Sequence, residues 1–550
     1  MARFTRVAGL VADKALGLPT RAVPYELREG VPTPMPDGVT LLANHYRPAG
    51  RDEPMPVVLI RVPYGRSGVY GQVFAAPLAR RGFQVFMQAT RGTFGSGGQF
   101  RPFTTERADG LATVDWLRKQ SWCDGRIAMA GGSYFGHTQW AVAPYADPPL
   151  TCVAPHITSA NMTDRLFYEH GVPQIQTALT WSASIGTQEQ PGLLSGLPDP
   201  RARTRVRRAL GKLPLQAVDV LVAGAAVPFW RDFVAHAEPG DTFWDQADHD
   251  GADLTRMPPV STVTGWWDLF VAGNLADYTA LRAAGVPARL VVGPWLHGEP
   301  GELRAILQSD AKWLDHHLNG GPAPEGAPVR VYLQQAKRWL EFDEWPPAAV
   351  REKDLHLSGE GGLKEKPDET SATSRFTYSP ARPTPTVGGP MLQPPGKQAD
   401  NRFIEERDDV LVFTGPVLDN DLDVVGPVNA TVFARTSIPY ADVFVRLCDV
   451  DPKGVSRNVV DGIQRLDPRT TAEAPGPDGV REIGVELFPT AYRFKAGHRL
   501  RVQVSGGAFP RYARNMGTAE PFGVATEGRD CAFEIFHDAD HPSHIRVHVL

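Results

Sequence analysis

Short apolar, β-branched runs alternate with stretches of helical periodicity over the first part of the chain. The predicted strands are 56–62, 82–90, 126–131 and 151–158. The predicted helices between them are 105–120 and 136–146. This alternation is typical of a mostly parallel sheet with helices on both faces.

The strand pattern stops between about 160 and 250, where aromatic residues at helical spacing replace it. Strands resume at 258–265 and 288–295, so the helical block is predicted to be an insertion between strands of one sheet. After 338–347 the chain turns rich in Pro, Gly and Ser, up to about residue 400.

Alternating apolar and polar positions mark the last part of the chain and predict an antiparallel β-sandwich. The clearest such runs are 429–436, 442–450, 499–506 and 543–550. Four segments follow from these changes of pattern. They are a first core segment at 1–158, a helical insertion at 159–250, a second core segment at 251–348 and a β-sandwich at 349–550.

Composition narrows the function classes. A net charge of −5 over 550 residues offers no basic surface for nucleic acid. The four cysteines lie far apart, without a CxxC pair for zinc and too few to cross-link a chain of this size. Asp13 and Lys14 interrupt the apolar part of the N-terminus, and no run reaches the length of a membrane span. We therefore expect a cytoplasmic protein.

Ser133 lies in the turn between a predicted strand and a predicted helix, with Gly131 and Gly132 before it and Gly136 after it. A serine hydroxyl becomes nucleophilic when a base takes its proton, so it must project from the backbone toward base and substrate. A sharp strand-to-helix turn projects it in this way and favours glycine beside it. The general pattern has glycine two residues after the serine, where this chain has Phe135.

Asp268 and His297 follow the two strands that resume after the helical insertion. On such a sheet the acid and the histidine of a triad come after the serine in the chain, each in a loop at the C-terminal end of a later strand. Each residue alone could have an ordinary structural role, Asp268 as a helix cap and His297 as a structural histidine. Because all three occur in the required order, we predict that His297 takes the proton of Ser133 and that Asp268 orients the imidazole.

The oxyanion of a tetrahedral intermediate needs hydrogen-bond donors near the serine. The backbone N–H of Tyr134 is one candidate. The second donor is expected from the loop at 61–68, where the residues alone do not separate the Tyr64 hydroxyl from a backbone amide. The glycine-rich run at 91–98 matches neither GxGxxG nor the P-loop and lacks its lysine, so we reject a nucleotide site and expect a turn near the site rim.

At these residues the chain resembles the cocaine esterase and X-prolyl dipeptidyl-peptidase family of serine hydrolases, which includes α-amino-acid ester hydrolases and glutaryl acylases. The resemblance rests on motifs along nearly the whole chain: MPDGVTLLANHYRP, VPYGR, ATRGTFGSGG, QSWCDGRIAMAGGSYFGHTQW, GWWDLF, GPWLHG, WLDHHLNG and GGAFPRYARN. The serine motif of that family is G-x-S-Y-x-G, which Phe135 and Gly136 fit.

The resemblance implies an α/β-hydrolase core with an inserted helical cap over the active site and a C-terminal jelly-roll β-sandwich. It also implies Ser133 as nucleophile, Asp268 and His297 as its partners, and the Tyr64 hydroxyl with the Tyr134 N–H as oxyanion donors. We expect no cofactor and no metal ion.

Family resemblance leaves the acyl group open, because fold and triad do not select it. In α-amino-acid ester hydrolases, acidic residues stand two and three positions after the triad aspartate, where this chain has Phe270 and Val271. We therefore expect an apolar acyl pocket, similar to the cocaine esterase branch. The candidate lining residues are Phe270, Val271, Trp267 and the cap residues Phe167, Trp181, Tyr168 and Trp230.

Three further features allow alternative interpretations. Glu169, Asp164 and Asp232 in the cap are the remaining carboxylates that could hold a substrate ammonium. The basic run at 201–212 is expected to be a solvated helix face rather than a surface that attracts anions. For the β-sandwich we expect a structural role that closes one side of the site, with a carbohydrate- or partner-binding module as the alternative.

These observations predict a serine hydrolase that cleaves carboxylic esters with small or aromatic acyl groups through an acyl-enzyme. The alternative is an X-Pro dipeptidyl-peptidase, an amidase or acylase, or an acyltransferase with the same triad. The expected partner is a small-molecule ester or amide, with neither nucleic acid nor a membrane span, and a homodimer is compatible with the sequence.

Overall fold

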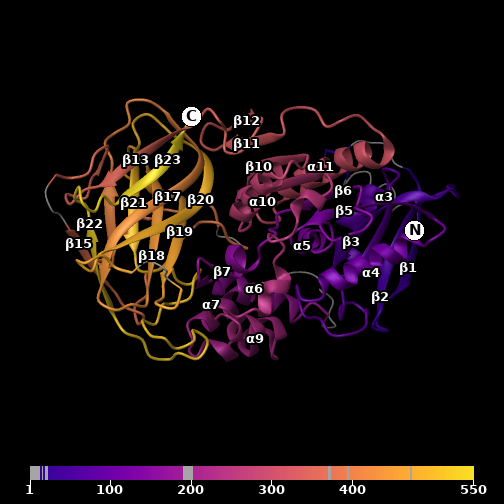
Figure 1. Cartoon of the computed structure of the whole chain (residues 1–550), viewed down its shortest axis with the longest axis horizontal. Helices are drawn as coiled ribbons and strands as arrows, with labels where there is room; N and C mark the ends of the chain where they lie inside the picture. Colours follow the sequence, from indigo (N-terminus) through magenta and orange to yellow (C-terminus); the bar gives the residue numbers. More distant parts are fainter. Residues whose placement is uncertain are drawn as a thin grey trace.

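The computed structural model describes residues 13–14, 17–18, 23–189, 202–369, 373–392, 396–470 and 474–550. Figure 1 shows a core of sheet and helices toward the N-terminal end and a β-sandwich at the opposite side. A group of helices, among them α6, α7 and α9, lies between these two parts at the bottom of the view (Figure 1).

Ten strands of the described residues form one mixed sheet in the order β1-β2-β4-β3-β5-β6-β9-β10-β11-β12. The strands are β1 (Tyr25–Pro34), β2 (Thr40–Pro48), β3 (Met55–Val62), β4 (Gln84–Ala89), β5 (Cys123–Gly132), β6 (Cys152–His156), β9 (Val260–Trp267), β10 (Ala288–Leu296), β11 (Val329–Leu333) and β12 (Arg338–Phe342). Strands from β4 to β11 pair in parallel, and the outer pairs are antiparallel. The predicted parallel sheet is thus confirmed, with antiparallel strands added at both edges.

Helices cover the central strands, which explains why these strands are buried. They are α2 (Gly68–Tyr70), η1 (Gly71–Ala75), α3 (Ala76–Ala79), α4 (Glu106–Arg118), α5 (Tyr134–Trp140), α10 (Val271–Ala283) and α11 (Pro300–Asn319). Every residue of β4 and of β9 is buried, as expected for strands covered on both faces. The helix predicted at 136–146 begins two residues earlier and ends at Trp140. Pro144, which lacks a backbone N–H, follows within the next turn.

A helical cap joins β6 to β9. Its elements are η2 (Thr163–Phe167), β7 (Tyr168–Glu169), β8 (Val172–Pro173), α6 (Ile175–Ile185), α7 (Ala202–Leu210), η3 (Leu215–Ala217), α8 (Asp219–Ala223), α9 (Pro228–Ala235), η4 (Phe243–Ala247) and η5 (Leu254–Arg256). The structure therefore adds a two-residue hairpin, β7–β8, to the predicted insertion. On α7, Arg207 and Arg208 are exposed while Val206 and Leu210 are buried, which is the expected solvated face.

The C-terminal part is a jelly-roll sandwich. One sheet contains β14 (Leu363–Lys364), β13 (Arg351–Leu357), β23 (His544–Val549), β17 (Leu422–Thr436), β22 (Cys531–Phe536), β15 (Thr373–Tyr378) and β20 (Arg481–Phe494). The other contains β16 (Val410–Thr414), β21 (Arg499–Ser505), β18 (Ala441–Val450) and β19 (Ser456–Leu466). A short helix, α12 (Arg402–Glu405), precedes β16. Strand β20 packs on β9, β11 and α10 of the core, so the sandwich and the core share one apolar interior.

A buried chain of charges connects cap and sandwich. Arg511 of the sandwich pairs with Asp461 at 2.5 Å and lies 3.6 Å from Glu169 of the cap. Asp461 also pairs with Arg446 at 2.9 Å, and Glu169 accepts a hydrogen bond from the Tyr512 hydroxyl at 2.7 Å. Within the described part of the chain, no helix is both long and apolar enough to cross a membrane.

Candidate active site

The turn that carries Ser133 packs closely against the residues that follow strand β6. Strand β5 ends at Gly132, α5 begins at Tyr134, and Ser133 between them has φ 60° and ψ −128°. A Cβ at Gly132 would lie 2.7 Å from the Ile157 side chain, and one at Gly136 would lie 2.6 Å from that of Thr158. Both glycines are therefore required by close contact with the neighbouring strand end.

His297 connects Ser133 to Asp268. Its Nε2 lies 3.1 Å from the Ser133 Oγ, and its Nδ1 lies 2.8 Å from an Asp268 carboxylate oxygen. The second Asp268 oxygen accepts the Phe270 backbone N–H at 2.7 Å. The Asp268 side chain is fully buried and that of His297 is 10% exposed, so the imidazole is the partner that solvent and substrate can reach. The structure thus brings together the three residues that sequence order singled out.

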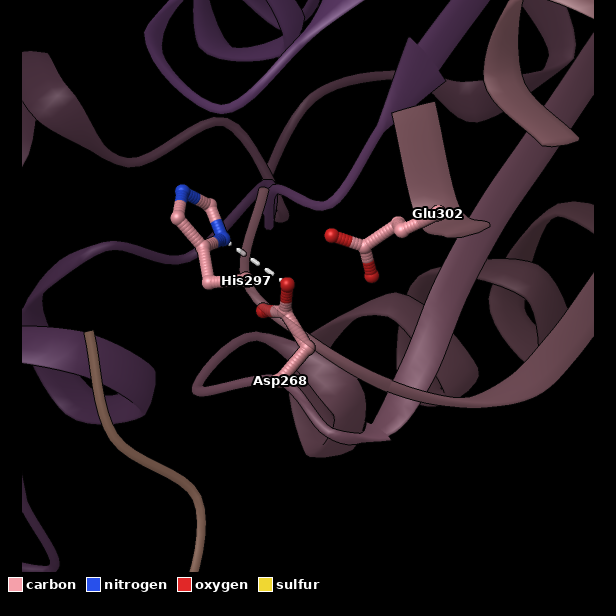
Figure 2. A group of neighbouring side chains, drawn as sticks. All are labelled: Asp268, His297 and Glu302. Atoms are coloured by element: carbon pink, nitrogen blue, oxygen red, sulfur yellow. Dashed lines mark hydrogen bonds and ion pairs between the residues drawn. The ribbon is translucent and has the colours of Figure 1, made fainter. Parts of the chain in front are cut away.

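Glu302 lies next to Asp268 and His297 and was not predicted from the sequence. It lies in the first turn of α11, is fully buried, and accepts the Gly298 backbone N–H at 2.6 Å. Figure 2 shows its carboxyl group turned toward Asp268 and His297. Their ligand atoms all lie within 4.8 Å of one another, close enough for a metal ion. Because the imidazole nitrogen is already bonded to Asp268, we interpret the group as a hydrogen-bonded cluster and not as a metal site.

Tyr64 and Tyr134 lie around the same cavity as Ser133 and come from two parts of the core. Tyr64 follows β3, and its hydroxyl oxygen accepts the Trp181 indole N–H of the cap at 2.8 Å. The Tyr134 backbone N–H opens α5, where the first turn of a helix leaves its N–H groups without intrahelical acceptors. Burial raises the pKa of the Tyr64 hydroxyl, so it remains protonated and able to donate.

The Tyr134 side chain is tied away from the serine. Its hydroxyl donates to Glu106 at 2.7 Å and accepts the Phe103 backbone N–H at 3.0 Å. Glu106 in turn pairs with the fully buried Arg61 at 2.7 Å. This buried chain fixes the start of α5, and with it the position of the Tyr134 N–H.

An apolar cavity of about 50 Å³ opens at Ser133. Its lining residues are Tyr64, Phe103, Ser133, Tyr134, Met162, Leu166, Phe167, Thr177, Ala178, Trp181, Phe229, Leu269, Phe270 and Leu392. They come from the core, from the cap and, through Leu392, from the connection between strands β15 and β16 of the sandwich. Phe103, Phe229 and Leu392 carry no motif and were not singled out by the sequence.

The candidate pocket residues divide into two groups. Phe270, Trp181 and Phe167 line the cavity. Trp267 and Val271, also expected there, do not line it, because they pack into the core of the sheet at the end of β9 and the start of α10. Of the three residues between these elements, Leu269 and Phe270 line the cavity and Asp268 does not.

The other two cap residues that were predicted to line the cavity, Tyr168 and Trp230, do not line it either. Tyr168 and Trp230 use their polar atoms inside the cap, with the carbonyl oxygens of Phe233 and Leu215 as acceptors. Of the candidate carboxylates, Glu169 binds the Tyr512 hydroxyl and neighbours Arg511, and Asp164 and Asp232 lie outside the lining. The described cavity lining therefore contains no carboxylate that could hold an ammonium group.

The glycine-rich loop at 91–98 reaches the cap. The Phe94 backbone N–H donates to Glu189 at 3.1 Å, and the Phe94 carbonyl oxygen accepts a short hydrogen bond from Arg66. A Cβ at Gly92 would lie 2.1 Å from the Phe100 nitrogen, so this glycine is required by a tight turn. The loop is a turn, as expected, and it also contacts the cap.

Comparisons with known proteins agree with this architecture. Residues 37–299 match the family model "X-Pro dipeptidyl-peptidase (S15 family)", and residues 325–545 match "X-Pro dipeptidyl-peptidase C-terminal non-catalytic domain". Cocaine esterase of Rhodococcus sp. (strain MB1 Bresler) is 31% identical over 96% of this chain and 99% of its own. A putative serine esterase of Mycobacterium bovis is 24% identical over 88% of this chain and 91% of its own.

Solved structures give the same result for the fold. An aminopeptidase from a marine sediment archaeon (Thaumarchaeota archaeon) is 25% identical, with a TM-score of 0.78 over 96% of both chains. An α-amino acid ester hydrolase is 24% identical, with a TM-score of 0.78 over 96% of this chain and 97% of its own. The chain therefore belongs to the family of serine hydrolases that contains cocaine esterase and the X-Pro dipeptidyl-peptidases.

Proposed function

We propose that this protein is a serine esterase that cleaves carboxylic esters with small or aromatic apolar acyl groups. The observation that carries the proposal is the hydrogen-bonded series Ser133, His297 and Asp268 at the mouth of a cavity without carboxylates. Relatives named cocaine esterase and serine esterase support ester hydrolysis as the reaction class.

The first half of the reaction forms an acyl-enzyme. His297 Nε2 takes the proton of the Ser133 hydroxyl as Oγ attacks the ester carbonyl carbon. Asp268, bonded to Nδ1, holds the imidazole in orientation and stabilises its protonated form. The Tyr134 N–H and the Tyr64 hydroxyl donate to the oxyanion that forms on the carbonyl oxygen. The alkoxide then leaves with the proton that His297 holds.

The second half returns the free enzyme. Water gives a proton to His297 Nε2 and attacks the acyl carbon, and the same donors bind the second oxyanion. The bond from the ester carbon to Ser133 Oγ breaks, and Oγ recovers its proton from His297. The acyl group leaves as a carboxylic acid.

The acyl group is expected to lie in the cavity among Phe103, Trp181 and Phe229. A charged ammonium there would lose its hydration without a carboxylate in return, which is costly. This argues against free amino-acid esters and against dipeptides with a free N-terminus, although the family model bears the name of an X-Pro dipeptidyl-peptidase.

Two measurements test the proposal. A fluorophosphonate is expected to add its mass to the wild-type protein and not to Ser133→Ala, and equal labelling of both would refute Ser133 as nucleophile. One preparation is then compared on p-nitrophenyl esters, X-Pro p-nitroanilides and phenylglycyl amides. We expect the esters to give the highest kcat/KM. Faster turnover of the X-Pro anilides would instead favour the peptidase.

A further inference from the structure

Glu302 holds the loop that carries His297. Its Oε2 accepts the N–H of Gly298, the residue directly after His297, at 2.6 Å. The side chain is fully buried beneath this loop, in the first turn of α11. A change at Glu302 therefore acts on the histidine through the backbone next to it.

The carboxyl groups of Glu302 and Asp268 lie side by side, and their partners differ. Both Asp268 oxygens have donors, one in His297 and one in the Phe270 N–H. Glu302 Oε1 is buried and accepts from no donor among the described residues. Two adjacent buried carboxyl groups cannot both ionise without a large cost, so one of them holds a proton. We assign this proton to Oε1 of Glu302, because that oxygen accepts no hydrogen bond from a described residue.

The charges around the pair favour the same assignment. Burial, followed by the negative charge of Asp268, raises the pKa of Glu302 well above its usual range. Glu299 faces the same loop and adds negative charge, and Lys397, from the connection between strands β15 and β16 of the sandwich, binds Glu299 at 2.7 Å. Two turns further along α11, Asp310 pairs with the buried His156 at 2.9 Å.

We propose that Glu302 is a positioning residue, whose carboxyl group keeps its proton, donates it in a hydrogen bond to Asp268, and holds the His297 loop through Gly298. The inference rests on the triad proposed above. The donated hydrogen bond fixes the orientation of Asp268 and reduces the negative charge that its carboxylate presents to His297. The imidazole is therefore held in position without being kept in its protonated form. Ser133 then meets a histidine that is free to take its proton.

Glu302→Gln is the sharpest test, because the amide keeps both hydrogen bonds of a neutral acid. Its N–H₂ replaces the donor to Asp268, and its oxygen still accepts from Gly298. We expect the midpoint of the acidic limb of kcat/KM against pH to stay within about 0.3 unit of wild type. If wild-type Glu302 were ionised, the substitution would remove a negative charge near His297 and shift this limb down by more than about one unit. That shift would overturn the proposal.

Glu302→Leu removes both hydrogen bonds. We expect kcat to fall about 10- to 100-fold with KM changed less than about 3-fold, because the loss concerns orientation of the triad and not substrate binding. An unchanged kcat would contradict a positioning role. Glu299→Gln is the matched control, since it neutralises a partly exposed carboxylate on the same loop, and its acidic limb is expected to move less than about 0.3 unit.

An infrared measurement gives a result that is independent of catalysis. The difference spectrum of wild type minus Glu302→Gln at pH 7 is expected to contain the C=O stretch of a protonated carboxylic acid. A carboxylate band in its place would refute the protonated state, even where Glu302→Leu does not fold. Should Ser133→Ala still react with the fluorophosphonate, the proposed function would fail while the infrared result on Glu302 stood.

Discussion

At the scale of single residues, the cap contacts the proposed oxyanion site through Trp181. The Trp181 indole N–H donates to the Tyr64 oxygen, so the single Tyr64 proton is left free to point at the substrate. In the proposed mechanism, Tyr64 thus accepts a hydrogen bond from the cap and donates one to the oxyanion. Tyr134 differs, because its hydroxyl is bound to Glu106 and its proposed oxyanion donor is the backbone N–H.

Removal of the Tyr64 hydroxyl is expected to lower kcat about 100-fold, because one of two oxyanion donors is lost. Tyr64→Phe is compared with wild type on p-nitrophenyl acetate. Tyr70→Phe is the matched control, since Tyr70 stacks on the Tyr64 ring at 5.4 Å and does not line the cavity. Equal kcat in Tyr64→Phe and Tyr70→Phe would leave Tyr64 a packing residue.

The sequence predicted the residues that have a position in a motif or in chain order, and it missed those that depend on packing. Ser133 is marked by its glycines, and Asp268 and His297 by their order after strands. Glu302 has no such mark, because an acidic residue in the first turn of a helix is ordinarily explained by the helix dipole. Its contact with Asp268 arises only when α11 packs beside the end of β9.

At the scale of elements, strand ends and helix faces decide which residues reach the cavity. Sequence periodicity correctly predicted β3, β4, β5 and the cap as a helical insertion. It did not separate the cavity face of a cap helix from its packing face, since both are apolar. On α9, Phe229 lines the cavity while Phe233, one turn later, packs inside the cap. On either side of the turn after β9, Trp267 and Val271 likewise point into the core.

Shortening Phe229 is expected to enlarge the cavity and change acyl preference. For Phe229→Ala, the ratio of kcat/KM for p-nitrophenyl octanoate to that for the acetate is expected to rise about 10-fold. The free energy of unfolding is expected to fall by about 3–5 kcal/mol. Phe233→Ala on the same helix is the control, with a similar loss of stability and an unchanged ratio. A similar change of ratio in both variants would place the acyl group elsewhere.

At the scale of the whole molecule, buried charges join cap and sandwich. Arg511 lies between Asp461 of the sandwich and Glu169 of the cap. Its removal would leave Glu169 without a cation and Asp461 with Arg446 alone inside the protein, which is costlier than the pair is worth. The cap is therefore held in place partly by a residue some 340 positions after it, as the 343-residue separation of Tyr512 and Glu169 also illustrates.

Arg511→Met is expected to lower the free energy of unfolding by about 3–5 kcal/mol, because it removes a cation from beside buried carboxyl groups. Urea unfolding, followed by tryptophan fluorescence, measures the loss. The control is Arg375→Met, which breaks an exposed ion pair with Glu534 and is expected to cost less than about 1 kcal/mol. Equal losses in the two variants would contradict a special role for the buried chain.

Three buried histidines make the whole fold sensitive to acid. Burial lowers the pKa of His45 in the core to about 4, of His249 between cap and core to about 3, and of His537 in the sandwich to about 4, from 6.5. Between pH 6.5 and the lowered pKa of each histidine, the unfolded chain binds more protons than the folded one. Stability is therefore lost as the pH falls below 6.5, by up to about 1.4 kcal/mol per pH unit for each histidine.

His537→Gln is expected to reduce this slope by the share of one histidine, because glutamine does not titrate and keeps a donor for Ser374. The free energy of unfolding is measured between pH 7 and pH 4 in urea. A slope identical to that of wild type would show that His537 does not contribute to the acid sensitivity.

Leu392 sets the moment in synthesis at which the site is complete. The serine, the aspartate and the histidine have all left the ribosome well before this residue, which lines the cavity from the connection between strands β15 and β16 of the sandwich. A nascent chain that ends before Leu392 therefore holds every reacting group but lacks an enclosed acyl site. Esterase activity in a growing chain is then expected to appear late, after most of the protein has been translated.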